Sequence, residues 1–162
     1  MRGTRSAIGI LALVALLAMT SVGVAAKAFP TKYTGTTSQG ERMSLVVGPS
    51  GRAVTIDMNY RFTCPAANKV LSTGDTWRAY LATTRKFRNA WSTDQPQDIP
   101  DFPDIGAGDL KATFKGTAFG LLGRTKAIGI YREQMTVLDG TGQVVQQCTT
   151  GTVRFSLKPA KQ

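Results

Sequence analysis

The sequence predicts an all-β domain, an antiparallel β-sandwich of about eight strands with one disulfide, and three observations carry that prediction. Apolar and polar residues alternate strictly over Val54–Cys64 (VTIDMNYRFTC), which is typical of a strand with one buried face. Turn sequences such as GPSGR at Gly48–Arg52 and DGTG at Asp139–Gly142 separate short segments of this kind. No helical period extends over three turns after residue 26. The same pattern fits a closed up-and-down β-barrel, which is the alternative.

The first 26 residues have the pattern of a secretory signal peptide. Arg2 and Arg5 precede the twelve-residue run Ile8–Met19, and small residues follow as far as Ala28. Cleavage fits after Ala26 or after Ala28. An uncleaved anchor is the alternative, although the run is short for the ~20 residues that span a bilayer. We therefore expect a secreted, extracellular protein with one β-domain over residues 27–162 and no membrane span after processing.

We expect the first half of the domain to run strand by strand. A polar edge strand over Tyr33–Gly40 precedes a short strand over Glu41–Val47. The GPSGR turn should join the short strand to Val54–Cys64 as a hairpin, because proline fixes φ and glycine permits a positive φ. Two further strands are expected within Thr76–Leu81 and Thr83–Trp91.

The last third of the chain returns to strands. Leu110–Lys115 alternates, and the glycines at 116, 120 and 123 predict a bend after it. The DGTG turn should join Thr125–Leu138 to Gln143–Cys148 as a hairpin. The final strand, Thr152–Leu157, has its apolar residues at odd positions, whereas Cys148 is even-numbered. One residue must therefore bulge out between them, and Gly151 is the natural position.

The only two cysteines, Cys64 and Cys148, are predicted to form a disulfide. Two cysteines in an exported chain most simply pair with each other. Metal ligation is disfavoured, because two cysteines without any histidine make an incomplete ligand set.

Short segments around these cysteines carry a resemblance. They are TSQG at Thr37–Gly40, YRFTC at Tyr60–Cys64 and CTTGTVRF at Cys148–Phe155. Together with the leader, they make the chain similar to a group of small exported β-proteins of Gram-positive bacteria, over most of residues 33–157. The resemblance implies export and fold, and it implies no activity, since that group has no assigned function.

The composition argues against catalysis. The chain has no histidine, which excludes Ser-His-Asp and Cys-His arrangements. It has no nucleophile elbow, phosphate-binding loop or dinucleotide fingerprint. We therefore expect that the protein is not an enzyme. The alternative is an extracellular carboxylate- or metal-dependent hydrolase, for which Asp57 and Glu133 are the acids expected on strands.

Aromatic and basic residues gather between positions 77 and 91, where they suggest a ligand-binding platform. Aromatic faces stack on sugar rings, and guanidinium groups hold carboxylate or phosphate. The candidates are Trp77, Arg78, Tyr80, Arg85, Lys86, Arg88 and Trp91. The alternative is that Trp77 and Trp91 are core residues. The formal charge of +10, which becomes +8 when Arg2 and Arg5 leave with the leader, favours an anionic cell-surface polymer or glycan as partner, with no specific nucleic acid.

The Pro/Asp-rich segment at residues 92–109 is expected to be a long surface loop. Its prolines at 96, 100 and 103 interrupt regular structure. Its acids are Asp94, Asp98, Asp101, Asp104 and Asp109. They suggest a weak calcium site, although their spacing matches no defined calcium motif. No other cofactor is expected. The alternative is a solvated acidic loop lying against Arg85, Lys86 and Arg88 and masking part of that basic surface.

These observations predict a secreted, monomeric, non-catalytic β-domain with a binding or structural role at the cell envelope, recognising an acidic or glycan polymer. Besides the hydrolase, a second alternative is a carrier that holds a small apolar ligand inside a barrel.

Overall fold

The computed structural model describes residues 28–65, 69–93, 95–98 and 110–161, and every element of two or more residues in that part is a strand. The strands are β1 Lys32–Thr36, β2 Arg42–Val47, β3 Ala53–Cys64, β4 Lys69–Tyr80, β5 Lys86–Ser92, β6 Gln97–Asp98, β7 Lys111–Leu122, β8 Ala127–Leu138, β9 Val144–Thr149 and β10 Val153–Pro159. The described ranges hold no helix long and apolar enough to cross a membrane. The all-β class is confirmed, whereas the predicted leader lies outside the described residues.

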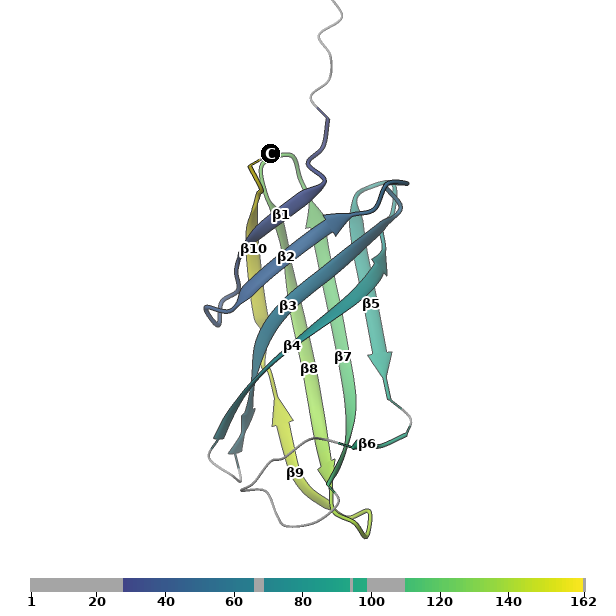
Figure 1. Ribbon diagram of the computed structural model, residues 1–162, viewed down its shortest axis with the longest axis vertical. Helices are drawn as coiled ribbons and strands as arrows, with labels where there is room; N and C mark the ends of the chain where they lie inside the picture. Colours follow the sequence, from purple (N-terminus) through teal and green to yellow (C-terminus); the bar gives the residue numbers. More distant parts are fainter. Residues whose placement is uncertain (1–27, 66–68, 94, 99–109, 162) are drawn as a thin grey trace, which may run out of the picture.

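The sheet closes on itself. β1 to β4 pair in sequence order, all antiparallel, and β7, β8 and β9 do the same. β10 pairs with both β1 and β8, and β9 pairs with both β8 and β3. The hydrogen-bonded ring therefore runs β10–β1–β2–β3–β9–β8 and back to β10. Figure 1 shows β1–β4 crossing in front of β7, β8 and β10. This pairing supports the barrel alternative, and the sandwich is not confirmed.

β4 extends this ring beside β3, and β7 and then β5 extend it beside β8; together these strands form the wall of the barrel. The seam between β4 and β5 in this wall is incompletely paired. Among the described strands, β4 is paired along its length only with β3, and β5 only with β7. The two meet in one bridge, between Leu81 and Phe87, at the end where the chain turns from β4 into β5. Below that bridge, side chains rather than backbone hydrogen bonds connect the two strands.

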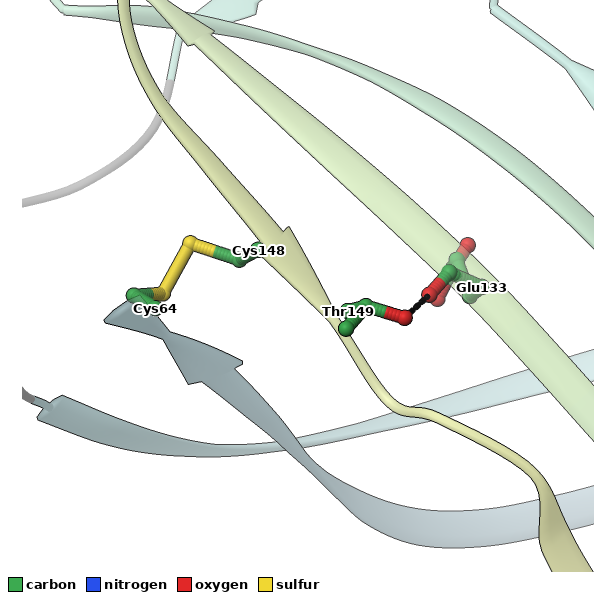
Figure 2. The surroundings of a disulfide bond; sticks show 4 residues. All are labelled: Cys64, Glu133, Cys148 and Thr149. Atoms are coloured by element: carbon green, nitrogen blue, oxygen red, sulfur yellow. Dashed lines mark hydrogen bonds between the residues drawn. A yellow bond between two sulfur atoms is a disulfide. The ribbon is translucent and has the colours of Figure 1, made fainter. Parts of the chain in front are cut away.

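The interior is filled by the inward face of each strand. On β3 every even-numbered residue from Val54 to Cys64 is buried, as the alternation predicts. Cys64 is bonded to Cys148 on β9 with an S–S distance of 2.01 Å, so the predicted disulfide is confirmed (Figure 2). It joins the end of β3 to a strand 84 residues further along the chain.

The two predicted turns are present, and so is the predicted one-residue slip at Gly151. In GPSGR, the amide of Gly51, at φ +67°, donates to the carbonyl of Gly48. In DGTG, Gly142 lies at φ +82° and the carboxylate of Asp139 accepts bonds from the amides of Thr141 and Gln143. Gly151, at φ +63°, separates β9 from β10, and the buried parity changes there from Cys148 to Val153 as expected. Glycine is suited to these positions because it adopts positive φ without a steric penalty.

The bend predicted at Gly116 and Gly120 is wrong, because β7 runs straight through both residues. A Cβ on Gly116 would lie 2.2 Å from Cζ2 of Trp91, and one on Gly120 would lie 2.3 Å from Cε1 of Phe87. Both glycines are therefore places where an aromatic ring from β5 lies flat against β7. β4 is also longer than expected, and β5 begins at Lys86 rather than Thr83.

Two residues of the predicted acidic loop, Gln97 and Asp98, form a short strand, β6. In β6, Gln97 pairs with Ala112 and Asp98 pairs with Lys111 at the start of β7. Lys86 pairs with Leu121 near the other end of β7, roughly 30 Å away at ~3.3 Å per residue. Residues 99–109 lie outside the described residues, so masking of the basic residues by them stays a prediction.

Candidate functional site

Two tryptophans bridge the seam between β4 and β5. Trp77 is directly opposite the buried Ile56 on β3, so its side chain points inward from β4. Trp91 points inward from β5, against Gly116. Their ring centroids are 5.8 Å apart, and each lies within 5.6 Å of the ring of Tyr131 on β8. Aromatic rings from three strands thus meet at the seam.

A buried carboxylate lies behind these rings. Glu133 is on the inward face of β8 and is 5% exposed. The indole Nε1 of Trp91 donates to its Oε1 at 2.8 Å, and the hydroxyl of Tyr131 donates to its Oε2 at 2.5 Å. The backbone of Glu133 is held as well: its amide donates to Thr150 Oγ1, and its carbonyl accepts from Thr149 Oγ1, as Figure 2 shows.

The charge of Glu133 is balanced by neutral donors alone among the described residues. The ion pair found there joins Arg61 to Glu41 at the surface, and no lysine or arginine of those ranges pairs with Glu133. Taking a carboxylate out of water costs several kcal/mol unless hydrogen bonds or a cation replace the lost hydration. A buried carboxylate without a cation is therefore a candidate site, because it favours a positively charged or proton-donating ligand.

Tyr60 and Tyr131, the tyrosines nearest Glu133, remain protonated because of this environment. Burial raises the pKa of Tyr131 far above its usual range, and the charge of Glu133 raises it further. Burial likewise raises the pKa of Tyr60, whose ring lies 5.0 Å from that of Tyr131. Both hydroxyls consequently act as hydrogen-bond donors at any physiological pH.

The inward face beside the seam is partly open to solvent. Leu71, Trp77, Trp91 and Phe114 pack against the core but are only half-buried. Asp75 is opposite the buried Met58, so it shares this inward face, yet it is exposed. The Nε1 of Trp77 is buried and has no hydrogen-bond partner within the described part of the chain. The seam therefore offers the aromatic faces of Trp77 and Trp91 and the unused Nε1 donor of Trp77. It also offers two carboxylates, that of Asp75 at its rim and that of Glu133 at its depth.

The predicted aromatic and basic platform is divided between the two faces of the wall. Trp77 and Trp91 point inward, whereas Arg78 and Tyr80 on β4, and Lys86 and Arg88 on β5, are exposed on the outer face. Arg85 lies in the β4–β5 turn at φ +59°, with its guanidinium 4.3 Å from the ring centroid of Phe29. Alternation along the strands causes the division, because neighbouring residues face opposite ways. The tryptophans thus share the inward face with Glu133 and Asp75, whereas the cations of β4 and β5 lie on the outer face.

The other predicted site residues do not converge in the described ranges. Asp57 is exposed on the outer face of β3, whereas Glu133 faces inward from β8. The two therefore do not form a carboxylate pair. Asp94, Asp101, Asp104 and Asp109 lie outside the described residues, and Asp98 is described only as a backbone position in β6. The ranges with defined placement hold no group of three potential metal ligands. A calcium site in this segment stays a prediction.

Sequence reasoning named Glu133 as a strand carboxylate but not as the centre of this site. The signal was present in its parity, since Tyr131, Met135 and Val137 share the odd positions and are buried with it. Its partners Trp91 and Tyr60 lie on β5 and β3, and only the closure of the sheet brings them together.

In comparisons with known proteins, no family model matches the chain, and no curated protein or solved structure matches it significantly.

Proposed function

We propose that the protein is an exported, non-catalytic binding domain whose interior takes a small ligand through the seam between β4 and β5. The ligand would carry a cationic group for Glu133 and an apolar body for the indole rings of Trp77 and Trp91. This proposal joins the expected binding role to the carrier alternative, with a charged end added to the apolar ligand.

The observation that carries the proposal is the buried Glu133 carboxylate, held by Trp91 and Tyr131 and without a cation among the described residues. Aromatic faces attract cations by roughly 0.5–2 kcal/mol each, and more when water is excluded. The exposed Asp75 adds a second negative charge at the rim. An organic ammonium group meets all of these features at once, whereas an anion would be repelled by both acids.

Catalysis has less support than binding. Both carboxylate oxygens of Glu133 already accept hydrogen bonds from residues of the chain itself. Asp57, the other acid considered for a carboxylate pair, is on the outer face.

Intrinsic fluorescence tests the proposal directly, because Trp77 and Trp91 are the only two tryptophans in the chain. We expect benzyltrimethylammonium to change the emission of the secreted protein in a saturable way. Its neutral isostere, with carbon in place of nitrogen, should bind at least about tenfold more weakly.

The matched variants are Glu133→Gln and Asp57→Asn. Each removes one strand carboxylate, but Asp57 points outward and has one weak side-chain partner, Thr76 at 3.4 Å. Glu133→Gln should remove the preference for the cation and Asp57→Asn should preserve it. Equal binding of the two probes to the parent protein, or an unchanged preference in Glu133→Gln, would show that the proposal is wrong.

A further inference from the structure

The outer face of β5, β7, β8 and β10 carries an apolar stripe flanked by cations, two on β5 and one on β10. Phe119 on β7 is opposite Ile130 on β8, and Leu121 is opposite Ile128. These four side chains form the stripe, and Phe119 is 45% exposed. Directly opposed residues of antiparallel strands share a face, so the stripe lies on the side of the wall away from Glu133.

Cations flank the stripe in register. Arg88 and Lys86 on β5 are opposite Phe119 and Leu121, and Arg154 on β10 is opposite Ile130. One continuous row across four strands therefore reads Arg88, Phe119, Ile130, Arg154. At ~4.8 Å between neighbouring strands, its two guanidinium-bearing residues are roughly 14 Å apart along the sheet.

The stripe is also hollowed. A groove of about 810 Å³ runs over it, and the β1–β2 turn at residues 36–38 forms one wall. Lys86, Lys126 and Arg154 reach the groove, and the apolar floor is the four-residue stripe. The four strands beneath contain a single acid, Glu133, and it points inward. The groove is thus apolar at its floor and positive at its edges.

We propose that this groove binds a single-chain anionic amphiphile, a molecule with one acyl chain and a negatively charged headgroup. The volume falls within the ~300–1,000 Å³ of small-molecule sites. The floor matches an acyl chain, which loses contact with water there, and the lysine and arginine side chains at the edge attract an anionic headgroup. The site does not depend on the seam between β4 and β5, because its residues lie on the opposite face of the wall.

The test compares two lysophospholipids that share one acyl chain, each below its critical micelle concentration, by isothermal titration calorimetry. Lysophosphatidylglycerol carries a net negative charge and lysophosphatidylcholine carries none. We expect the anionic lipid to bind about tenfold more tightly or better, with an advantage that shrinks as salt rises.

Two charge-reversed double variants separate the groove from general basicity. Lys86→Glu with Arg154→Glu should abolish the preference for the anionic lipid. Arg52→Glu with Arg78→Glu changes the net charge equally at exposed positions, in the β2–β3 turn and on β4, and should retain the preference. Phe119→Ser should weaken binding of both lipids, since it removes apolar floor without altering charge.

Several outcomes would overturn the proposal. Equal affinity for the two lipids would do so, as would an equal loss in both double variants. Binding to anionic vesicles alone, unaffected by Phe119→Ser, would show a general electrostatic attraction instead. Sedimentation that reveals a dimer dissociated by Phe119→Ser would show that a second copy of the chain covers the groove.

Discussion

At the scale of single residues, Glu133 determines the character of the interior. Each of its carboxylate oxygens accepts one hydrogen bond, from an indole and from a phenol, and the same carboxylate raises the pKa of Tyr60 and of Tyr131. A charge in this position requires neighbours that keep their protons. Tyr131 meets that requirement because burial disfavours its ionised form and the charge of Glu133 disfavours it further.

The raised pKa values of Tyr60 and Tyr131 predict a loss of stability in alkali. Above about pH 10 the tyrosines of the unfolded chain lose their protons while these two keep theirs when folded. The free energy of unfolding should therefore fall with rising pH, by about 1.4 kcal/mol per pH unit for each tyrosine. Urea denaturation between pH 9 and pH 12 measures this slope.

The control for that slope is the pair of variants Tyr60→Phe and Tyr131→Phe. Each should flatten the pH dependence by the contribution of one tyrosine, whereas Tyr80→Phe, at an exposed position, should leave it unchanged. Identical slopes in all three variants would contradict the assignment.

The sequence carried part of this residue-scale picture. The parity of β8 is enough to place Glu133 among buried residues, since Tyr131 and Met135 flank it on the same face. Its hydrogen-bond partner Trp91 is 42 residues earlier in the chain. Contacts of that separation depend on how the sheet closes, and alternation along one strand contains no information about closure.

At the scale of elements, β7 shows how a strand can look interrupted in sequence and yet be continuous. Gly116 and Gly120 carry no side chain on the inward face, and rings from the neighbouring β5 fill the space. Glycine weakens an isolated strand, and a packed aromatic ring from the neighbouring strand offsets that weakness. The hairpins at GPSGR and DGTG were predictable because turn chemistry is local, whereas the role of these glycines is set by Trp91 and Phe87.

Gly116→Ala should therefore displace Trp91. The new Cβ would lie 2.2 Å from Cζ2 of the indole, and the ring would have to move away from β7 and from Glu133. We expect destabilisation of about 1–3 kcal/mol and a red shift of tryptophan emission, measured by urea denaturation followed by fluorescence.

Gly140→Ala is the matched comparison, because a Cβ there meets nothing within 4 Å. It should change the free energy of unfolding by less than about 1 kcal/mol and leave the emission unchanged. If Gly116→Ala proves equally mild, the indole is not held against β7 as described.

At the scale of the whole molecule, one covalent bond and one late strand hold the wall together. The disulfide joins β3 to β9, and β10 bridges β1 to β8. Length, alternation and cysteine count were enough to predict an all-β chain with this disulfide. They did not distinguish a sandwich from a closed sheet, because both architectures need strands with one buried face and differ only in which edges pair.

Removing the disulfide should lower stability substantially. A loop of 84 residues corresponds to about 4–5 kcal/mol in the chain-entropy description, which is an upper figure. We expect Cys64→Ala with Cys148→Ala to lower the urea midpoint accordingly, and the unreduced parent protein to give no reaction with a thiol label. Two reactive thiols in the native parent would contradict the bond.

The arrangement of β10 has a consequence for the timing of folding. β1 begins at Lys32, but one of its two edges stays unsatisfied until Val153–Pro159 is available, more than a hundred residues later. The pairing of β1 is therefore completed only after β10 has been synthesised. Such distant pairings make folding slow, because the chain must close a long loop before any contact is gained. If the predicted leader directs export from the N-terminus, the wall can be completed only on the far side of the membrane. Until then the exposed edges of β1 and β8 would be vulnerable to pairing with other chains.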